Sequence, residues 1–232
     1  MQEDSVKLTR RRKLHNIIVS FLVTSVFIIA LFVAAGSIHW LWAWVLTVVL
    51  LLSNVISILL LDPALIEERT GVKKGYERRD VPFAFIIGRF GPLAILIVSG
   101  LDFRFGWSPS LSIIYAISGL VILLVGYIPV FWAMYENRFF SGVVRIQDER
   151  GHHVINTGPY HFIRHPGYLG SVIFLLALPF VLMSYWALIP AAFTIIITIA
   201  RIVLEENTLK RELTGYEEYM QQVRFRLVPS IW

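Results

Sequence analysis

The chain has 232 residues, of which 56% are hydrophobic and 16% charged, with a mean hydropathy of +0.68. A soluble domain carries about a quarter charged residues. The apolar residues here fall into long blocks, so the composition excludes one large soluble domain and predicts several membrane spans. The chain has no cysteine, which excludes disulfides, thiolate metal sites and cysteine nucleophiles. Its net charge of +5 need not mean that it binds nucleic acid, because in a membrane protein the positions of Lys and Arg first of all indicate orientation.

The first half of the chain contains four apolar runs, which predict four membrane spans. Gly36 and Ser37 separate the first two runs, and Asp62-Pro63 ends the second. The third run contains Arg89, so it is not a clean lipid-facing helix. We expect these spans at about residues 14–35, 41–61, 83–101 and 111–135.

Two polar stretches interrupt these spans. Residues 62–82 form a long polar loop with charges of both signs, and a short interfacial helix is one form that it could take. Its segment Glu67–Asp80 is most simply a solvated charged loop, with capping of the site from the same side as the alternative. Asp102, Arg104 and Trp107 fall in a predicted outside loop, where a structural role is the simpler interpretation.

The second half begins with a long polar segment, residues 136–166, and continues with two apolar runs, 167–183 and 185–199. Only a few residues separate the two runs, so we expect a tight helical hairpin. The tail from Arg201 has an amphipathic helical pattern to about Val223. The predicted fold class is an all-α, polytopic transmembrane bundle of about six spans. Its N-terminal spans occupy residues 1–135, and a catalytic region with a cytosolic C-terminal helix occupies residues 136–232.

The distribution of Lys and Arg predicts the orientation. They gather in the N-terminal tail, in both long polar segments and after the last apolar run, whereas the predicted outside loops hold only Arg104. By the positive-inside rule both termini are then cytosolic. A short chain without a targeting signal suits a bacterial inner membrane, so we expect a multi-pass protein there.

Residues 158–170 are polar, aromatic and rich in turn formers, and apolar runs flank them. Pro166 suits the first turn of a helix, whose free N–H groups would lie beside Arg164 and His165. This arrangement suits an anion such as a carboxylate or a phosphate. An ordinary loop, in which Arg164 only obeys the positive-inside rule, is the alternative. Three aromatic side chains offer flat faces for an adenine ring or a sulfonium: Tyr160, Phe162 and Tyr168.

A second polar cluster, Arg201, Glu205 and Glu206, follows the last apolar run. Arg201 and Glu205 share a helix face, and charges so close to an apolar block are either paired or functional. One carboxylate could hold an ammonium group while Arg201 orients an anionic substrate. An interfacial ion pair worth under about 1 kcal/mol is the alternative. His152 and His153 are adjacent, so their side chains diverge, and we expect no metal site.

Together these residues resemble the isoprenylcysteine carboxyl methyltransferase family, and the related phospholipid N-methyltransferases, over about residues 136–229. The RHPxY element and the later pair of glutamates, in tandem and separated by a hairpin, are the specific part of the resemblance. In chain order the matching residues are Gln147, His152-His153-Val154-Ile155, Gly158-Pro159-Tyr160, Arg164-His165-Pro166-Gly167-Tyr168, Arg201, Glu205-Glu206 and Gly215-Tyr216-Glu217-Glu218-Tyr219.

The resemblance implies a methyltransferase that uses S-adenosyl-L-methionine at the membrane surface. The acceptor would be a lipophilic or prenylated molecule that enters from the bilayer, with carboxyl O-methylation favoured and no nucleic-acid partner. Arg201 would contact the substrate, and Arg164 would assist. Glu205 or Glu206 would take part in catalysis and bind the cofactor. The remaining cofactor-binding residues would be Gln147, His152, His153, Val154, Ile155, Gly158, Tyr160, His165, Pro166, Gly167 and Tyr168.

Two other interpretations remain open. A membrane sterol-type reductase has a similar C-terminal pattern and uses NADPH, but only a short loop separates Gln147 from Gly158, and no second basic cluster lies beside it. A non-catalytic membrane scaffold is the other alternative, and the retention of Arg164, His165 and both glutamates disfavours it.

Overall fold

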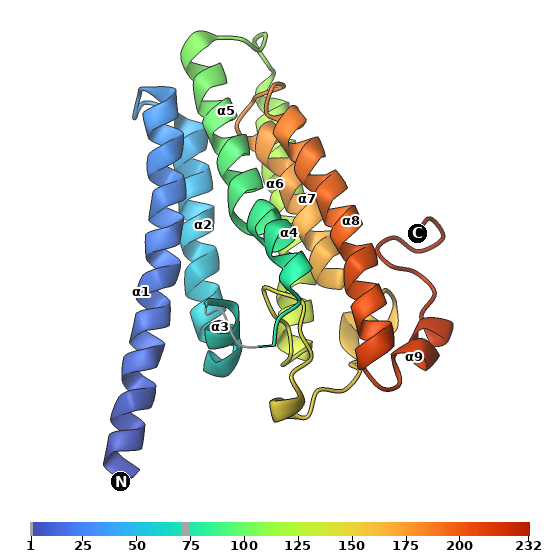
Figure 1. Ribbon diagram of the computed structural model, residues 1–232. Coiled ribbons are helices and arrows are strands. Elements are labelled where there is room, and N and C mark those ends of the chain that lie inside the picture. Colours follow the sequence, from blue (N-terminus) through green and yellow to red (C-terminus); the bar gives the residue numbers. More distant parts are fainter. Residues whose placement is uncertain (1, 71–74) are drawn as a thin grey trace.

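The computed structural model describes residues 2–70 and 75–232, and these are helical with no strand. Six helices form a bundle and alternate in direction along the chain (Figure 1). They are α1 (Gln2–Ala35), α2 (Leu41–Leu60), α5 (Gly91–Phe105), α6 (Ile113–Glu136), α7 (Pro166–Val181) and α8 (Leu188–Glu212). Shorter elements are α3 (Pro63–Thr70), the 3-10 turns η1 (Arg78–Asp80), η3 (Asp148–Arg150) and η4 (Gly158–His161), α4 (Val81–Phe85), the π-turn η2 (Ile86–Phe90) and α9 (Tyr216–Gln222).

Within the described residues, five helical segments are long and apolar enough to cross a membrane. A spanning helix needs about 20 residues, and these segments are Leu14–Ala35, Leu41–Leu60, Arg78–Phe105, Ile113–Glu136 and Leu188–Glu212. The sixth apolar helix, α7, has 16 residues and packs against α5, α6 and α8 in the middle of the bundle. The expected polytopic all-α fold, with a hairpin of α7 and α8 at its end, is therefore confirmed.

Two boundaries differ from the sequence interpretation. The third span extends beyond residues 83–101, because η1, α4, η2 and α5 stack into one segment that runs from Arg78 to Phe105. The last span does not end at residue 199. Helix α8 continues to Glu212, and a left-handed Gly215 with φ of 85° separates it from the short α9. Arg201, Glu205 and Glu206 therefore belong to the spanning helix itself.

Helices α6 and α7 make the most extensive helix contact in the described part of the chain, and glycines allow it. A Cβ built on Gly170 would lie 2.5 Å from the backbone oxygen of Gly126 and would also collide with Val130. Small residues at such a crossing allow membrane helices to approach closely. This contact places the start of α7, with its polar motif, against the end of α6.

Replacing Gly170 by Ala is expected to destabilise the bundle by about 1–3 kcal/mol, because the methyl group meets backbone that cannot move aside. Thermal unfolding followed by fluorescence-detected size exclusion measures the effect. Gly88→Ala is the control, because a Cβ at Gly88 meets nothing within 4 Å. Equal melting temperatures for the two variants would show that the α6–α7 contact tolerates the extra methyl group.

Far from the polar motifs, Asp102 ties the end of α5 to the connection between α7 and α8. Its carboxylate is 3% exposed and accepts hydrogen bonds from the Ser108 backbone N–H at 2.7 Å, the Ser108 hydroxyl at 2.6 Å and the Ser184 hydroxyl at 2.5 Å. The structural role expected for Asp102 is confirmed, although the residue lies in the last turns of α5 rather than in a loop.

Candidate functional site

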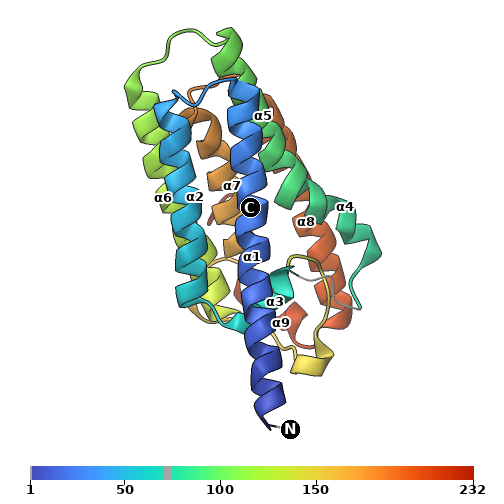
Figure 2. The same cartoon turned by 90° about the vertical axis from the view of Figure 1, so that its left-hand side faces the viewer.

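A cavity of about 670 Å³ lies at the end of the bundle where α3 and α9 are found. Its walls come from α4, η2, the end of α6, the segment 137–145, the start of α7, and residues of α8 and α9. Ligand cavities in proteins are typically about 300–1,000 Å³. Figure 2 shows α4 beside α8, where the two helices bring the first and second halves of the chain together around this cavity.

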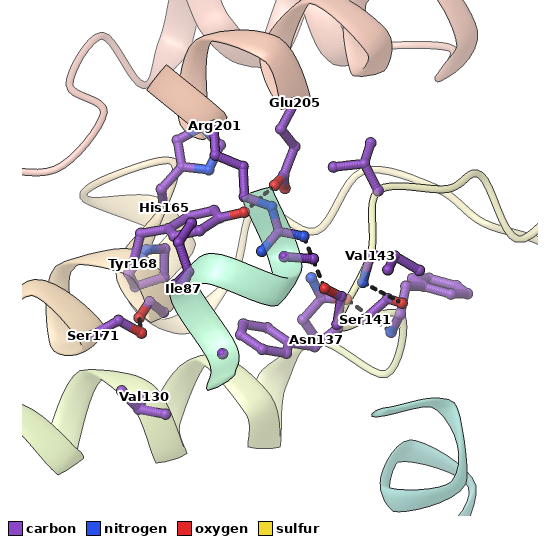
Figure 3. Close-up of a pocket in the computed structure, with 18 of the residues that line it drawn as sticks. Ile87, Val130, Asn137, Ser141, Val143, His165, Tyr168, Ser171, Arg201 and Glu205 are labelled. Carbon is purple, nitrogen blue, oxygen red and sulfur yellow. Dashed lines mark hydrogen bonds between the residues drawn. The ribbon is translucent and has the colours of Figure 1, made fainter. Parts of the chain in front are cut away.

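The polar side of the cavity is formed by α7 and α8 facing each other (Figure 3). The Tyr168 hydroxyl donates a 2.6 Å hydrogen bond to Glu205 Oε2, and the guanidinium carbon of Arg201 lies 5.6 Å from the centre of the Tyr168 ring. Arg201 and Glu205 stand one helical turn apart on α8 and both line the cavity. A cation-binding carboxylate and an anion-binding guanidinium therefore share one wall.

Glu206 is not part of the cavity wall and lies in a buried ion-pair cluster. Its carboxylate is 2.6 Å from Arg164 Nε, 3.2 Å from His165 Nε2 and 2.7 Å from Arg226 Nε. Arg164 also donates to the backbone oxygens of Val223 and Arg224 at 2.8 and 2.7 Å. Glu206 thus anchors the C-terminal segment beneath the polar motif, whereas Glu205 is half-buried and turned to the cavity.

The segment expected to be a solvated loop, residues 62–82, contributes two buried carboxylates instead. Asp80 is 2% exposed and binds Arg201, and Glu68 is 5% exposed and binds Arg145 Nε at 2.8 Å. This hydrogen bond raises the pKa of the Arg145 guanidinium. The solvated-loop interpretation was wrong for these two residues, because tertiary partners far along the chain remove them from water. Residues 71–74 of the segment lie outside the described residues.

Gln147 supports the next loop from behind the cavity. Its side chain is fully buried, with Nε2 donating to the Phe139 backbone oxygen at 2.7 Å and Oε1 accepting from Arg150 at 2.6 Å. The Gln147 backbone N–H donates to His152 Nδ1 at 3.2 Å, and the His152 ring packs on Phe139 with ring centroids 4.4 Å apart. Gln147 thus positions the wall that contains His152.

Burial, followed by the neighbouring charge of His153, lowers the pKa of His152 from 6.5 to about 4. The unfolded chain therefore binds this proton between pH 6.5 and about 4 while the folded chain does not, so folding stability falls as the pH falls through that window. We expect the melting temperature of the wild type to fall further than that of His152→Phe on acidification, with the difference levelling off below about pH 4. His161→Phe, at an exposed histidine, is the control and should follow the wild type. Parallel curves for wild type and His152→Phe would contradict the assignment.

Tyr160 and the tyrosines of α9 close the cavity from the side of η4. The Tyr219 hydroxyl donates to the Tyr160 backbone oxygen at 2.7 Å, and Asn137 Nδ2 donates to the Tyr160 hydroxyl at 3.3 Å. Tyr216 lines the same cavity, and its hydroxyl is buried with no hydrogen-bond partner among the described residues. Burial, then the charges of Glu206 and Glu205, raises the pKa of Tyr216, so it remains a neutral donor.

The structure brings most of the sequence-predicted site residues to the cavity. Four predicted residues are not in its walls. They are Gln147 and Glu206, described above, Phe162, which is 59% exposed, and Gly158, which begins η4 with a φ of 56° and where an added Cβ would meet Glu136. The predicted residues that line the cavity are His152, His153, Val154, Ile155, Tyr160, Arg164, His165, Pro166, Gly167, Tyr168, Arg201 and Glu205.

Sequence reasoning missed several residues at the site. Asn137, Gly142 and Val144 lie in a loop that the sequence motifs do not include. Asp80 lies in the segment 62–82, which was interpreted as a solvated loop or as a cover for the site but not as a source of a site residue. The one available signal for Asp80 was its position beside a hydrophobic block, where a lone carboxylate is unfavourable unless it is paired. Within the described residues, no group of three His, Asp or Glu side chains could hold a metal ion.

The fold and the site define a polytopic helical membrane protein with a polar cavity at one end of its bundle. A model of the isoprenylcysteine carboxyl methyltransferase family matches residues 119–211, from the first part of α6 almost to the end of α8, which include the RHPxY element and both glutamates. Over this segment the chain is similar to that family.

Two rice proteins, from the indica and japonica subspecies, are among the similar curated proteins. Each is named "Probable protein-S-isoprenylcysteine O-methyltransferase" and is 36% identical over 111 residues, which cover 45% of this chain and 56% of the rice protein. The chain thus matches about half the length of these relatives.

Proposed function

We propose that this protein is a methyltransferase that uses S-adenosyl-L-methionine to methylate the carboxylate of a prenylated or similar lipid-like acceptor. The observation that carries the proposal is the pairing of Glu205 and Arg201 on one wall of a single cavity. A carboxylate complements the cationic sulfonium and ammonium groups of the cofactor, and a guanidinium complements an acid acceptor. The family match and the names of the rice relatives support the same chemistry.

The residues present suit this cofactor. Glu205 presents its carboxylate beside the Tyr168 ring, and Leu209, Val154 and Tyr216 provide an apolar surface with one unpaired hydroxyl, which suits an adenosyl group. When bound, the cofactor supplies an activated methyl group. Because a carboxylate acceptor is already ionised, the site needs no base. The work of the protein is to align the acceptor and exclude water.

The other side of the cavity suits an apolar acceptor. It is lined by Phe85 and Ile87 on the third span, Tyr127 on α6, and Phe174 and Leu175 on α7. Phe85 is 59% exposed on the outer surface of the bundle, which faces lipid in a membrane. We therefore propose that the acceptor enters between helices from the bilayer.

We also propose that the cavity faces the cytosol, together with both termini, because the basic residues gather at this end of the bundle. The expectation of a bacterial inner membrane stays a prediction, since the relatives reported above are rice proteins.

Calorimetry on the detergent-purified protein tests the function. We expect binding of S-adenosylmethionine and S-adenosylhomocysteine but not of NADPH, followed by transfer of a labelled methyl group to N-acetyl-S-farnesylcysteine. The control variant Glu212→Gln, at an exposed position on α8, should bind S-adenosylmethionine and S-adenosylhomocysteine like the wild type. Binding of NADPH alone would favour a reductase, and no binding of any of the three would favour a scaffold.

A further inference from the structure

The guanidinium of Arg201 is held along one edge by Asp80. Arg201 Nε donates to Asp80 Oδ1 at 2.7 Å and Nη2 donates to Oδ2 at 2.8 Å. These two parallel hydrogen bonds are the bidentate geometry of an arginine–carboxylate pair, and we call the Nε–Nη2 side of the guanidinium its two-point edge. Nη2 also donates to the Gly142 backbone oxygen at 2.8 Å. The Asp80 carboxylate accepts a further hydrogen bond from the Val144 N–H at 2.7 Å, which fixes its own position. The two-point edge of Arg201 is therefore already occupied within the protein.

One nitrogen of Arg201 remains. Among the described residues Nη1 has no hydrogen-bond partner, while Arg201 lines the cavity and its side chain is 8% exposed. An incoming carboxylate can therefore meet this guanidinium only through Nη1, at a single point. Asp80 itself lies behind Arg201 and is not part of the cavity wall.

This restriction bears on the proposed reaction. Methyl transfer to a carboxylate requires a free lone pair on the attacking oxygen. A guanidinium that binds through its two-point edge engages both carboxylate oxygens and would reduce the nucleophilicity of each. A one-point contact orients the acceptor and leaves its second oxygen free.

We infer that Asp80 is a positioning residue that occupies the two-point edge of Arg201, so that the acceptor carboxylate is bound through Nη1 alone. The inference rests on the proposed function. As the free oxygen forms its bond to the methyl carbon, the carbon–sulfur bond breaks and its electron pair stays on sulfur. The products are a neutral ester and a neutral thioether, and no proton moves.

Asp80 belongs to the first half of the chain, whereas Arg201 belongs to the second half. It lies 121 residues before Arg201, in η1, outside the segment that matches the family model. Contacts of α8 with η1 and α4 hold the two residues together. The first half of the chain is thus not only a membrane anchor, because it completes the acceptor side of the site.

Asp80→Asn tests the inference, with Asp102→Asn as the matched control. Both substitutions neutralise a carboxylate that is no more than 3% exposed and accepts at least three hydrogen bonds, but Asp102 lies at the other end of the bundle. Three quantities are measured for each variant. They are the melting temperature, the affinity for S-adenosylhomocysteine, and the affinity and single-turnover rate for N-acetyl-S-farnesylcysteine.

We expect Asp80→Asn to lower the single-turnover rate about tenfold to a hundredfold, the scale of a misaligned reacting group. Its affinity for the farnesylated acceptor should stay equal or increase, because Arg201 gains both net charge and its two-point edge. S-adenosylhomocysteine should bind as in the wild type. Asp102→Asn should lose comparable stability with a rate within about threefold of the wild type, because its partners do not touch the cavity.

Two results would overturn the inference while leaving the proposed function intact. One is an unchanged rate in Asp80→Asn. The other is that Asp80→Asn and Asp102→Asn both lose rate, acceptor affinity and melting temperature, and by the same amounts. By contrast, a wild-type protein that binds neither S-adenosylhomocysteine nor the acceptor would remove the function itself.

Discussion

Replacing Glu206 by Gln is expected to destabilise the protein by about 3–5 kcal/mol, the usual loss when one member of a buried ion pair is removed. The carboxylate is 2% exposed and is shared by Arg164, His165 and Arg226. A neutral amide leaves at least one buried guanidinium without a charge partner. The segment after α9, which Arg164 holds through two backbone oxygens, should loosen first. Thermal unfolding and limited proteolysis of the C-terminal segment measure both effects.

The neighbouring substitution Glu205→Gln is the matched comparison and should behave differently. Glu205 is only half-buried, and its hydrogen-bond partner among the described residues, the Tyr168 hydroxyl, can donate equally well to an amide oxygen. We expect a stability change within about 1 kcal/mol but about a tenfold to hundredfold loss of affinity for S-adenosylhomocysteine, as for a lost hydrogen bond to a charged group. If the two variants exchanged these outcomes, Glu206 would be the ligand-facing carboxylate and the cavity assignment would be wrong.

Replacing Arg201 by Lys is expected to lower the methyl-transfer rate about a hundredfold, although the charge is kept. A single ammonium cannot hold both oxygens of Asp80 and also present a second nitrogen to the cavity, as the planar guanidinium does. Binding of S-adenosylhomocysteine should change less than about threefold, because Glu205 and the Tyr216 wall are unaltered. Single-turnover transfer to N-acetyl-S-farnesylcysteine, together with calorimetry, measures the two quantities separately.

Arg211→Lys is the control for this substitution, because the Arg211 side chain is 64% exposed at the end of the same helix. Its rate should equal that of the wild type. A rate for Arg201→Lys within a few-fold of that control would mean that charge alone suffices at this position, and the fork geometry would then have no catalytic role.

The spans were predictable because helix length and apolar content are local properties. Each apolar run long enough to cross a bilayer is helical in the structure, and Gly36, Gly106 and Pro166 mark helix ends as their backbone preferences dictate. The helical pattern from Arg201 onward was predictable, but its continuity with the last span in one helix, α8, was not. Its charged residues resemble the end of a span in sequence, whereas in the fold they continue the helix and form one wall of a polar cavity.

The candidate site was predictable where its residues are close together in sequence. The motif around Arg164 and Tyr168 and the Arg201–Glu205 pair were singled out by residue type and spacing, and the structure brings them to one cavity. Gln147 is an instructive exception. Its place in the motif indicated a cofactor contact, but its side chain is fully buried in hydrogen bonds to Phe139 and Arg150, away from the cavity.

The amino-acid sequence by itself thus determined that this is a multi-span membrane protein with a polar, family-typical region in its second half. Only the tertiary structure decided which glutamate faces the cavity and which residue holds Arg201. Adjacent residues on a helix point about 100° apart, so Glu205 and Glu206 are alike in sequence but meet different surroundings. Asp80 acquires its role from a partner 121 residues away, and such a pairing exists only after the helices have packed.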